Sequence, residues 1–119
     1  MEFTIDKQKE HIAVIKLDGR LVGEFQTIRL NDQVDDLLED NFYHLIFDLS
    51  QLEYMNSSGL NFLLKVLTRV RKHDGEVVLC TLNSALLDLL VTTKLNLFFT
   101  ICSDVPAAIG HFMKENPVK

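Results

Sequence analysis

The chain has 119 residues, of which 47% are hydrophobic and 24% are charged, and its net charge at pH 7 is −5. This length and composition are typical of one globular domain that buries a core without disulfides or a metal ion. The acidic balance argues against nucleic acid as a general partner, because a phosphate backbone attracts basic surfaces. The N-terminus lacks the pattern of a signal peptide, and no apolar run is long enough to span a membrane. We therefore expect a cytoplasmic protein with no membrane partner.

In chain order, the hydrophobic pattern predicts two strands, a helix, and then strands that alternate with helices. Asp18-Gly19-Arg20 is a turn signal after the second strand. Gly75 is a C-cap candidate behind the second helix, and Asn83 and Asp104 are typical residues at helix starts. The predicted strands are residues 3–5, 11–17, 43–49, 76–80 and 97–101, and the predicted helices are residues 24–39, 57–73, 84–90 and a last one that follows residues 103–104.

The order of these elements predicts an α/β fold. Alternation of strands and helices in the later half implies right-handed βαβ units and a parallel sheet. The first two strands are joined too tightly for a parallel crossover, so we expect them to pair antiparallel. The result is a small mixed, mainly parallel β-sheet, followed by a frayed tail at residues 116–119.

The segment Asn56-Ser57-Ser58-Gly59 lies where a buried strand gives way to a helix. A helix N-terminus presents free N–H groups and a positive partial charge, so a phosphate is well tolerated there. Helix capping alone, worth about 1 kcal/mol, is the simpler role of such residues. However, a cap needs one oxygen and this segment has three, and Gly59 costs the helix roughly 1 kcal/mol relative to Ala. A phosphate on Ser57 would add roughly two negative charges and disrupt an interface while leaving the fold intact.

Asp48 is the competing candidate, because it follows a buried apolar run. In receiver domains of two-component signalling, an aspartate at a strand end accepts phosphate with the help of a divalent metal. That chemistry needs an acidic pair after the first strand and a lysine after the last strand. Here the first long strand ends in a single acid, Asp18. The last strand ends in Cys102-Ser103, with no lysine. We therefore expect Asp48 to organise the following loop by accepting backbone N–H bonds.

Other chemistry is sparse in this sequence. The four histidines are scattered, and no pair has metal-ligand spacing. No glycine-rich phosphate loop is present. Cys80 and Cys102 lie in apolar strand-like runs, so we expect buried free thiols rather than nucleophiles. The sequence thus predicts no catalytic residues, no cofactor and no metal site.

Residues 45–60 resemble the core motif of the STAS family, whose name joins sulphate transporters and anti-sigma factor antagonists. The family motif reads D-L-S, a connector ending in M, and then D-S-S-G-L. This chain has Asp48-Leu49-Ser50, a connector ending in Met55, and then Asn56-Ser57-Ser58-Gly59-Leu60. The likeness spans nearly the whole chain and is greatest to the stand-alone bacterial anti-sigma factor antagonists. It implies a single STAS domain over residues 1–115, with helices packed mostly on one face of the sheet.

The resemblance also implies a role in partner switching. A non-enzymatic antagonist of this kind binds an anti-sigma factor serine kinase that otherwise holds a sigma factor. This binding frees the sigma factor. Phosphorylation of the first serine of the motif, here Ser57, ends the binding, and a PP2C-type phosphatase restores it. Asn56, Ser58 and Gly59 would form the supporting switch loop.

Two positions depart from the family pattern: Asn56 and Val22 stand where aspartate is usual. They motivate an alternative, a constitutive STAS adaptor or scaffold that phosphorylation does not regulate. A nucleotide-binding domain is a third hypothesis, which the lack of a phosphate loop argues against. The sequence leaves self-association open.

Overall fold

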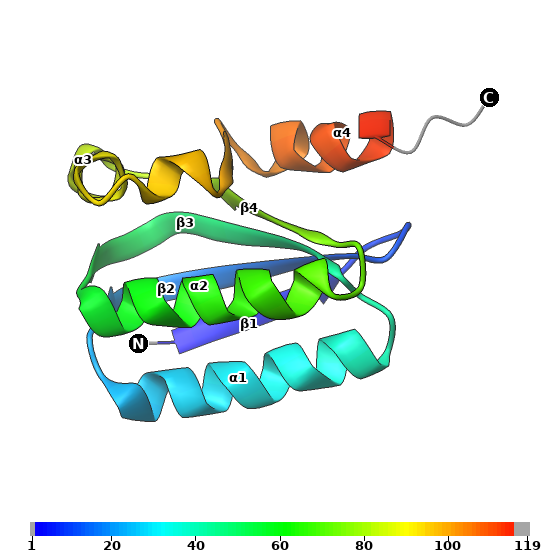
Figure 1. The fold of residues 1–119 in the computed structure, drawn as a ribbon, viewed down its shortest axis with the longest axis horizontal. Helices are drawn as coiled ribbons and strands as arrows, with labels where there is room; N and C mark the ends of the chain where they lie inside the picture. The colour runs from blue at the N-terminus through cyan, green and yellow to red at the C-terminus, as the bar shows by residue number, and fades with distance from the viewer. Residues whose placement is uncertain (1, 116–119) are drawn as a thin grey trace.

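A five-stranded mixed sheet runs through the middle of the molecule (Figure 1). The computed structural model describes residues 2–115. The strands lie side by side in chain order; β1 is antiparallel to β2, and the others pair in parallel, as expected from the sequence. The elements are β1 (Glu2–Lys7), β2 (Ile12–Leu21), α1 (Glu24–Glu39), β3 (His44–Met55), α2 (Ser57–Arg71), β4 (Glu76–Cys80), α3 (Ser84–Thr92), η1 (Leu95–Leu97), β5 (Thr100–Cys102) and α4 (Val105–Glu115).

The second and third strands are longer than their hydrophobic pattern predicts. Residues 18–20, expected as a turn, lie inside β2, and residues 51–55, expected as a connector, lie inside β3. These two extensions pair with each other, with Gly19 opposite Leu52 and Leu21 opposite Met55. The ladder has register irregularities on both sides of Gly19, whose φ is 107°. The turn residues therefore mark a β-bulge within a continuing strand, and the prediction of a turn was wrong.

The last strand is shorter than predicted and starts later. Lys94 takes a left-handed backbone conformation with a φ of 64°, and the chain then makes the short helix η1. Of the apolar residues that follow, Phe99 is buried, whereas Leu97 and Phe98 are exposed. Only residues 100–102 pair with β4. Leu97, the predicted first residue of the strand, belongs to η1 instead, so the chain reaches the edge of the sheet later.

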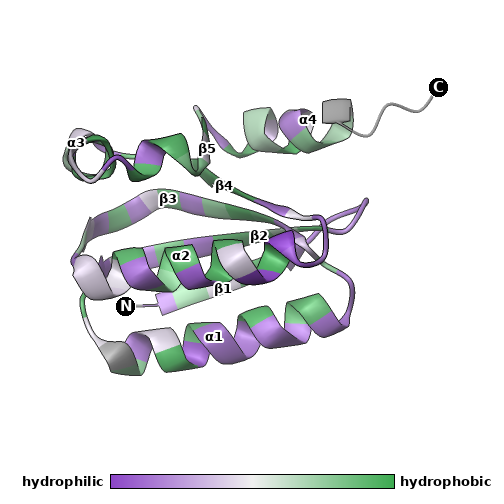
Figure 2. Cartoon of the chain, viewed as in Figure 1, coloured by the Kyte–Doolittle hydropathy of each residue, from purple (hydrophilic) through white to green (hydrophobic). Residues whose placement is uncertain are grey.

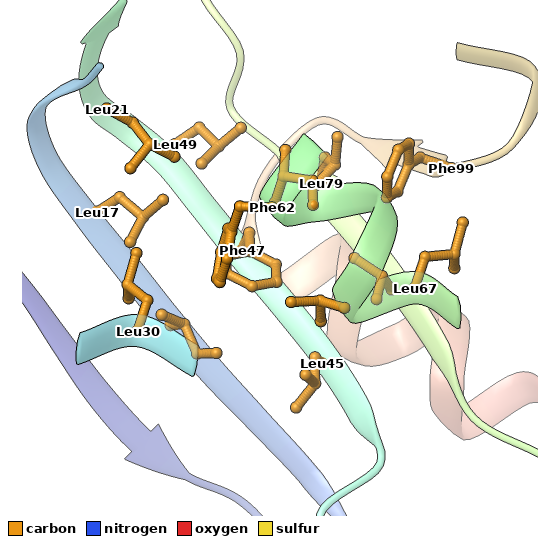
Figure 3. Packing of buried hydrophobic residues seen from close by; sticks show 14 of the residues in the cluster. Leu17, Leu21, Leu30, Leu45, Phe47, Leu49, Phe62, Leu67, Leu79 and Phe99 are labelled. Atoms are coloured by element: carbon orange, nitrogen blue, oxygen red, sulfur yellow. The ribbon is translucent and has the colours of Figure 1, made fainter. Parts of the chain in front are cut away.

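Two hydrophobic clusters lie on opposite faces of the sheet. The larger cluster contains Phe47 of β3 and Phe62 of α2, whose rings meet edge to face with centroids 6.1 Å apart (Figure 3). Helices α1, α2 and α3 all contribute to this cluster. Helix α4 supplies Ala108 and Phe112 to the smaller cluster. Figure 2 shows α1 banded in hydrophobic and hydrophilic residues, as expected of a helix with one buried face.

Helix α2 ends by a different mechanism from the predicted one. Asp74, not Gly75, takes the left-handed conformation, with a φ of 59°. The N–H of Gly75 donates to the carbonyl of Val70 at 2.8 Å, and that of Asp74 to the carbonyl of Arg71 at 3.1 Å, which is the Schellman arrangement. Gly75 is needed for space, because a Cβ there would overlap the carbonyl oxygen of Tyr43.

Within the described residues, no helix has the length and apolar character needed to cross a membrane.

Candidate functional site

The segment Asn56-Ser57-Ser58-Gly59 connects the end of β3 to the first turn of α2. Asn56 is the N-cap residue, and its Oδ1 accepts hydrogen bonds from the N–H of Ser58 at 3.0 Å and of Gly59 at 3.3 Å. Ser57 is the first residue of α2 and is exposed, whereas Ser58 is half-buried. Among residues 2–115, none forms a hydrogen bond with the Ser57 hydroxyl. Asn56 therefore caps the helix, and Ser57 is exposed and takes no part in capping.

Gly59 allows the first turn of α2 to pack directly on the ends of two strands. It is buried, and a Cβ at this position would lie 2.9 Å from Cβ of Met55 and 3.1 Å from Cγ and Cδ2 of Leu21. Met55 and Leu21 are themselves paired at the ends of β3 and β2. The absence of a side chain at Gly59 thus allows the Ser57 turn to lie close to the sheet.

The loop between β2 and α1 lies against the same turn. Oε1 of Gln26 accepts hydrogen bonds from the N–H of Val22 at 2.8 Å and of Gly23 at 3.1 Å, and its Nε2 donates to the carbonyl of Arg20 at 2.9 Å. Nδ2 of Asn56 donates to the carbonyl of Val22 at 2.9 Å. These hydrogen bonds thereby link the start of α1 to the start of α2.

This loop and the first turns of α1 carry exposed apolar side chains, Val22, Phe25 and Ile28, which we call the apolar patch. Their exposed fractions are 40%, 87% and 57%. This patch was not predicted from the sequence, although the helical spacing contains a signal for it. At about 100° per residue, Phe25 and Ile28 lie on the side of the helix opposite to the buried stripe that contains Leu30.

A groove of about 330 Å³ separates α1 from α2 and reaches the Ser58 end of the turn. Its lining is mixed: apolar side chains alternate with amides and hydroxyls, and a lysine stands among them. The lining residues are Thr27, Ile28, Asn31, Ser58, Asn61, Phe62 and Lys65. The apolar patch, the Ser57 turn and this groove thus form a continuous surface at one end of α1 and α2.

Asp48 lies away from this surface. It sits in the middle of β3, opposite Lys16 on one side and Cys80 on the other. Along an extended strand it is roughly 25 Å from Asn56. Its Oδ1 accepts the N–H of Ser50 at 3.0 Å, as expected, but the residues that follow continue the strand. The expectation that Asp48 organises a loop was wrong, because the pairing with β2 extends β3 beyond it.

Three of the histidines are not scattered but surround one tyrosine. His11 stacks on Tyr43 with ring centroids 5.0 Å apart, His73 stacks at 6.4 Å, and His44 meets the same ring edge-on at 5.0 Å. Across the part of the chain that the structure describes, no group of three or more His, Cys, Asp or Glu residues could hold a metal ion. This histidine cluster is therefore a packing feature rather than a metal centre.

The two cysteines are free, as expected. Cys80 is buried, and burial raises the pKa of its thiol from 9.0 to about 11. Cys102 is half-buried rather than buried, which differs from the expectation, and partial burial again raises its pKa. Neither thiol is activated as a nucleophile.

The chain is thus a small α/β domain whose candidate site is an exposed serine at a helix start. The chain belongs to the STAS domain family, because the family model matches residues 4–108.

Known proteins are similar to this chain in sequence or in fold. BtrV of Bordetella bronchiseptica, which bears the name of an anti-sigma factor antagonist, is 25% identical over 113 residues, or 89% of this chain and 97% of BtrV. SpoIIAA of Bacillus has been solved in an unphosphorylated form, with a TM-score of 0.76 and 13% identity, and in a phosphorylated form, with 0.71 and 14%. Each comparison covers 98% of this chain and 100% of SpoIIAA. An anti-sigma factor antagonist from Mycobacterium paratuberculosis has a TM-score of 0.79 and 18% identity over 92% of each chain.

Proposed function

We propose that this protein is an anti-sigma factor antagonist in a bacterial partner-switching pathway. It binds an anti-sigma factor serine kinase while Ser57 is unmodified. Phosphorylation of Ser57 by that kinase ends the complex, and a PP2C-type phosphatase restores it. The protein itself performs no catalysis in this scheme. The observation that carries the proposal is the exposed Ser57 hydroxyl, which is free of any capping role at the N-terminus of α2.

The electrostatics of this position support the proposal. Helix α2 has no acidic residue in its first turn, so its N-terminal partial charge is not already neutralised. A phosphate on Ser57 would therefore be tolerated by the folded chain. The same phosphate would place roughly two negative charges beside Val22, where an apolar partner surface would have to desolvate them. One modification thus preserves the fold and weakens the complex.

The relatives support the same role. BtrV bears the name of an antagonist of this class, and SpoIIAA is a protein of this fold for which an unphosphorylated and a phosphorylated form are known. The apolar patch and the adjoining groove offer a contact surface of mixed character next to the acceptor. Such a surface suits a reversible complex, because transient interfaces combine apolar and polar contacts.

Ser84 is an internal control for Ser57. Both serines are exposed, and each is the first residue of a helix directly after an asparagine N-cap, α2 for Ser57 and α3 for Ser84. The wild-type chain, Ser57→Ala and Ser84→Ala would be incubated with ATP and a serine kinase of the anti-sigma type from the same organism. We expect one phosphate on the wild type and on Ser84→Ala, and none on Ser57→Ala, by mass spectrometry of the intact chain and its peptides.

Binding to the same kinase completes the test. We expect Ser57→Asp to weaken the complex at least about tenfold, which corresponds to roughly 1.4 kcal/mol, and Ser84→Asp to leave it unchanged. Phosphate on another residue would contradict the assignment of the acceptor. A Ser57→Asp chain that binds as tightly as the wild type would instead favour the constitutive adaptor.

A further inference from the structure

The side chain of Asn56 makes two different kinds of contact. Its Oδ1 accepts from the N–H of Ser58 and of Gly59, at the start of its own helix. Its Nδ2 donates to the carbonyl of Val22, 34 residues earlier in the chain, at 2.9 Å. The two ends of the amide are therefore distinguished by their partners, donors on one side and a carbonyl on the other.

The loop that Asn56 reaches is itself held firmly. Gln26 binds the N–H groups of Val22 and Gly23 through Oε1 and the carbonyl of Arg20 through Nε2. The backbone N–H of Asn56 also donates to the carbonyl of Leu21 at 3.2 Å. A chain of hydrogen bonds thus runs from the first turn of α1, through Val22, to the first turn of α2.

From this connection we infer that Asn56 is a positioning residue, which fixes the position of the Ser57 turn relative to the apolar patch of Val22, Phe25 and Ile28. The kinase would then meet the hydroxyl and the patch as one preformed surface, and less of its binding energy would be lost in ordering two loops. This inference rests on the proposed function, and it goes beyond that function by assigning a role to the amide nitrogen of Asn56.

The chemistry of the amide allows this role to be separated from capping. A serine or an aspartate at the N-cap also accepts from the first N–H groups of the helix. Neither replaces the Nδ2 donor, and a carboxylate would additionally face the carbonyl oxygen of Val22 with like partial charge. Asn56→Ser therefore removes the Nδ2 bond to Val22 without adding charge beside Ser57, whereas Asn56→Asp removes this bond and adds charge. Agreement between the two variants identifies the connection as the cause.

Asn83 provides a matched control at another helix. Its Oδ1 accepts the N–H of Leu86 at 2.8 Å as the N-cap of α3, and its Nδ2 donates to the carbonyl of Leu52 at 3.3 Å. Asn83→Ser therefore removes the same type of bond from the same type of cap, away from the first turn of α2. A general loss of stability would appear in this variant too.

The test measures amide hydrogen exchange and phosphorylation kinetics on the full chain. In Asn56→Ser and Asn56→Asp we expect the N–H groups of Val22 and Gly23 to exchange roughly three- to tenfold faster than in the wild type, and those of Ser58 and Gly59 to stay within about twofold. With the serine kinase and ATP, we expect both variants to raise the KM for the chain by a similar factor, with kcat unchanged. Asn83→Ser should match the wild type at Val22 and Gly23 and in KM.

Several outcomes would overturn the inference. Unchanged exchange at Val22 and Gly23 would show that the Nδ2 bond holds nothing in place. A raised KM in Asn56→Asp alone would identify charge, not position, as the cause. Faster exchange with an unchanged KM would refute the positioning role and leave the proposed function standing. A wild-type chain that the kinase does not phosphorylate would contradict the proposed function itself, and the inference with it.

Discussion

Replacing Gly59 by alanine tests how tightly the Ser57 turn is packed on the sheet. The new Cβ would lie 2.9 Å from Cβ of Met55 and 3.1 Å from two carbons of Leu21. Non-bonded carbons prefer about 3.5–4.0 Å. Met55 and Leu21 are 1% and 0% exposed, and Cβ of Met55 is fixed to the backbone, so neither neighbour has free space to move into.

Two opposing terms determine the size of the effect. Overpacking of a well-packed core costs about 1–3 kcal/mol. Alanine recovers at most about 1 kcal/mol of helix propensity. We therefore expect Gly59→Ala to lower the free energy of unfolding by about 1 kcal/mol. The strain falls on the first turn of α2, so kinase binding should weaken as well.

Gly110 is the matched control, because it lies inside α4 and a Cβ there would meet nothing within 4 Å. Gly110→Ala should raise the free energy of unfolding by up to about 1 kcal/mol. The assay is urea unfolding followed by circular dichroism, together with thermal unfolding, where a gap of about 2 kcal/mol between the variants corresponds to roughly 8 °C. If Gly59→Ala were as stable as Gly110→Ala, the close packing of α2 on the ends of β2 and β3 would be refuted.

Three further predictions follow from burial and exposure. Gly75→Ala should lower the free energy of unfolding by roughly 2–3 kcal/mol in urea, because the added Cβ overlaps a backbone carbonyl; a neutral result would contradict the close approach. Phe25→Ser should leave stability within about 0.5 kcal/mol and weaken kinase binding in a pull-down, whereas Phe98→Ser, 53% exposed and outside the apolar patch, should change neither. At pH 8, alkylation of the native chain should modify Cys102 before Cys80, because Cys80 is fully buried and its pKa of about 11 keeps the thiol protonated; equal rates would refute this order.

Elements governed by local chemistry were predicted well. The bounds of α1 and β4 agree with the hydrophobic pattern. The predicted caps of the last two helices are present: the N–H of Leu86 is bound by Asn83, and that of Ala107 by Asp104 at 2.9 Å. These features depend on residues three or four positions apart, so a short window of sequence contains all the information they need.

Elements governed by a distant neighbour were predicted poorly. Gly19 reads as a turn in isolation, yet it pairs with Leu52 and continues the strand. Phe25 and Ile28, within the helix predicted at residues 24–39, face solvent, and this exposure was not predicted. For Gly19 the deciding partner lies on another strand, outside any local window. The exposure of Phe25 and Ile28, in contrast, follows from their position opposite the buried stripe of α1.

Periodicity and cap chemistry are local properties, and they were sufficient to predict an α/β domain with a serine at the start of an amphipathic helix. The surroundings of that serine, in contrast, depend on contacts between residues far apart in the chain. The bond from Asn56 to the carbonyl of Val22 joins residues 34 apart, and Gly59 is required by side chains from two different strands. Such contacts depend on how the strands are placed in the sheet, which packing of the whole core settles.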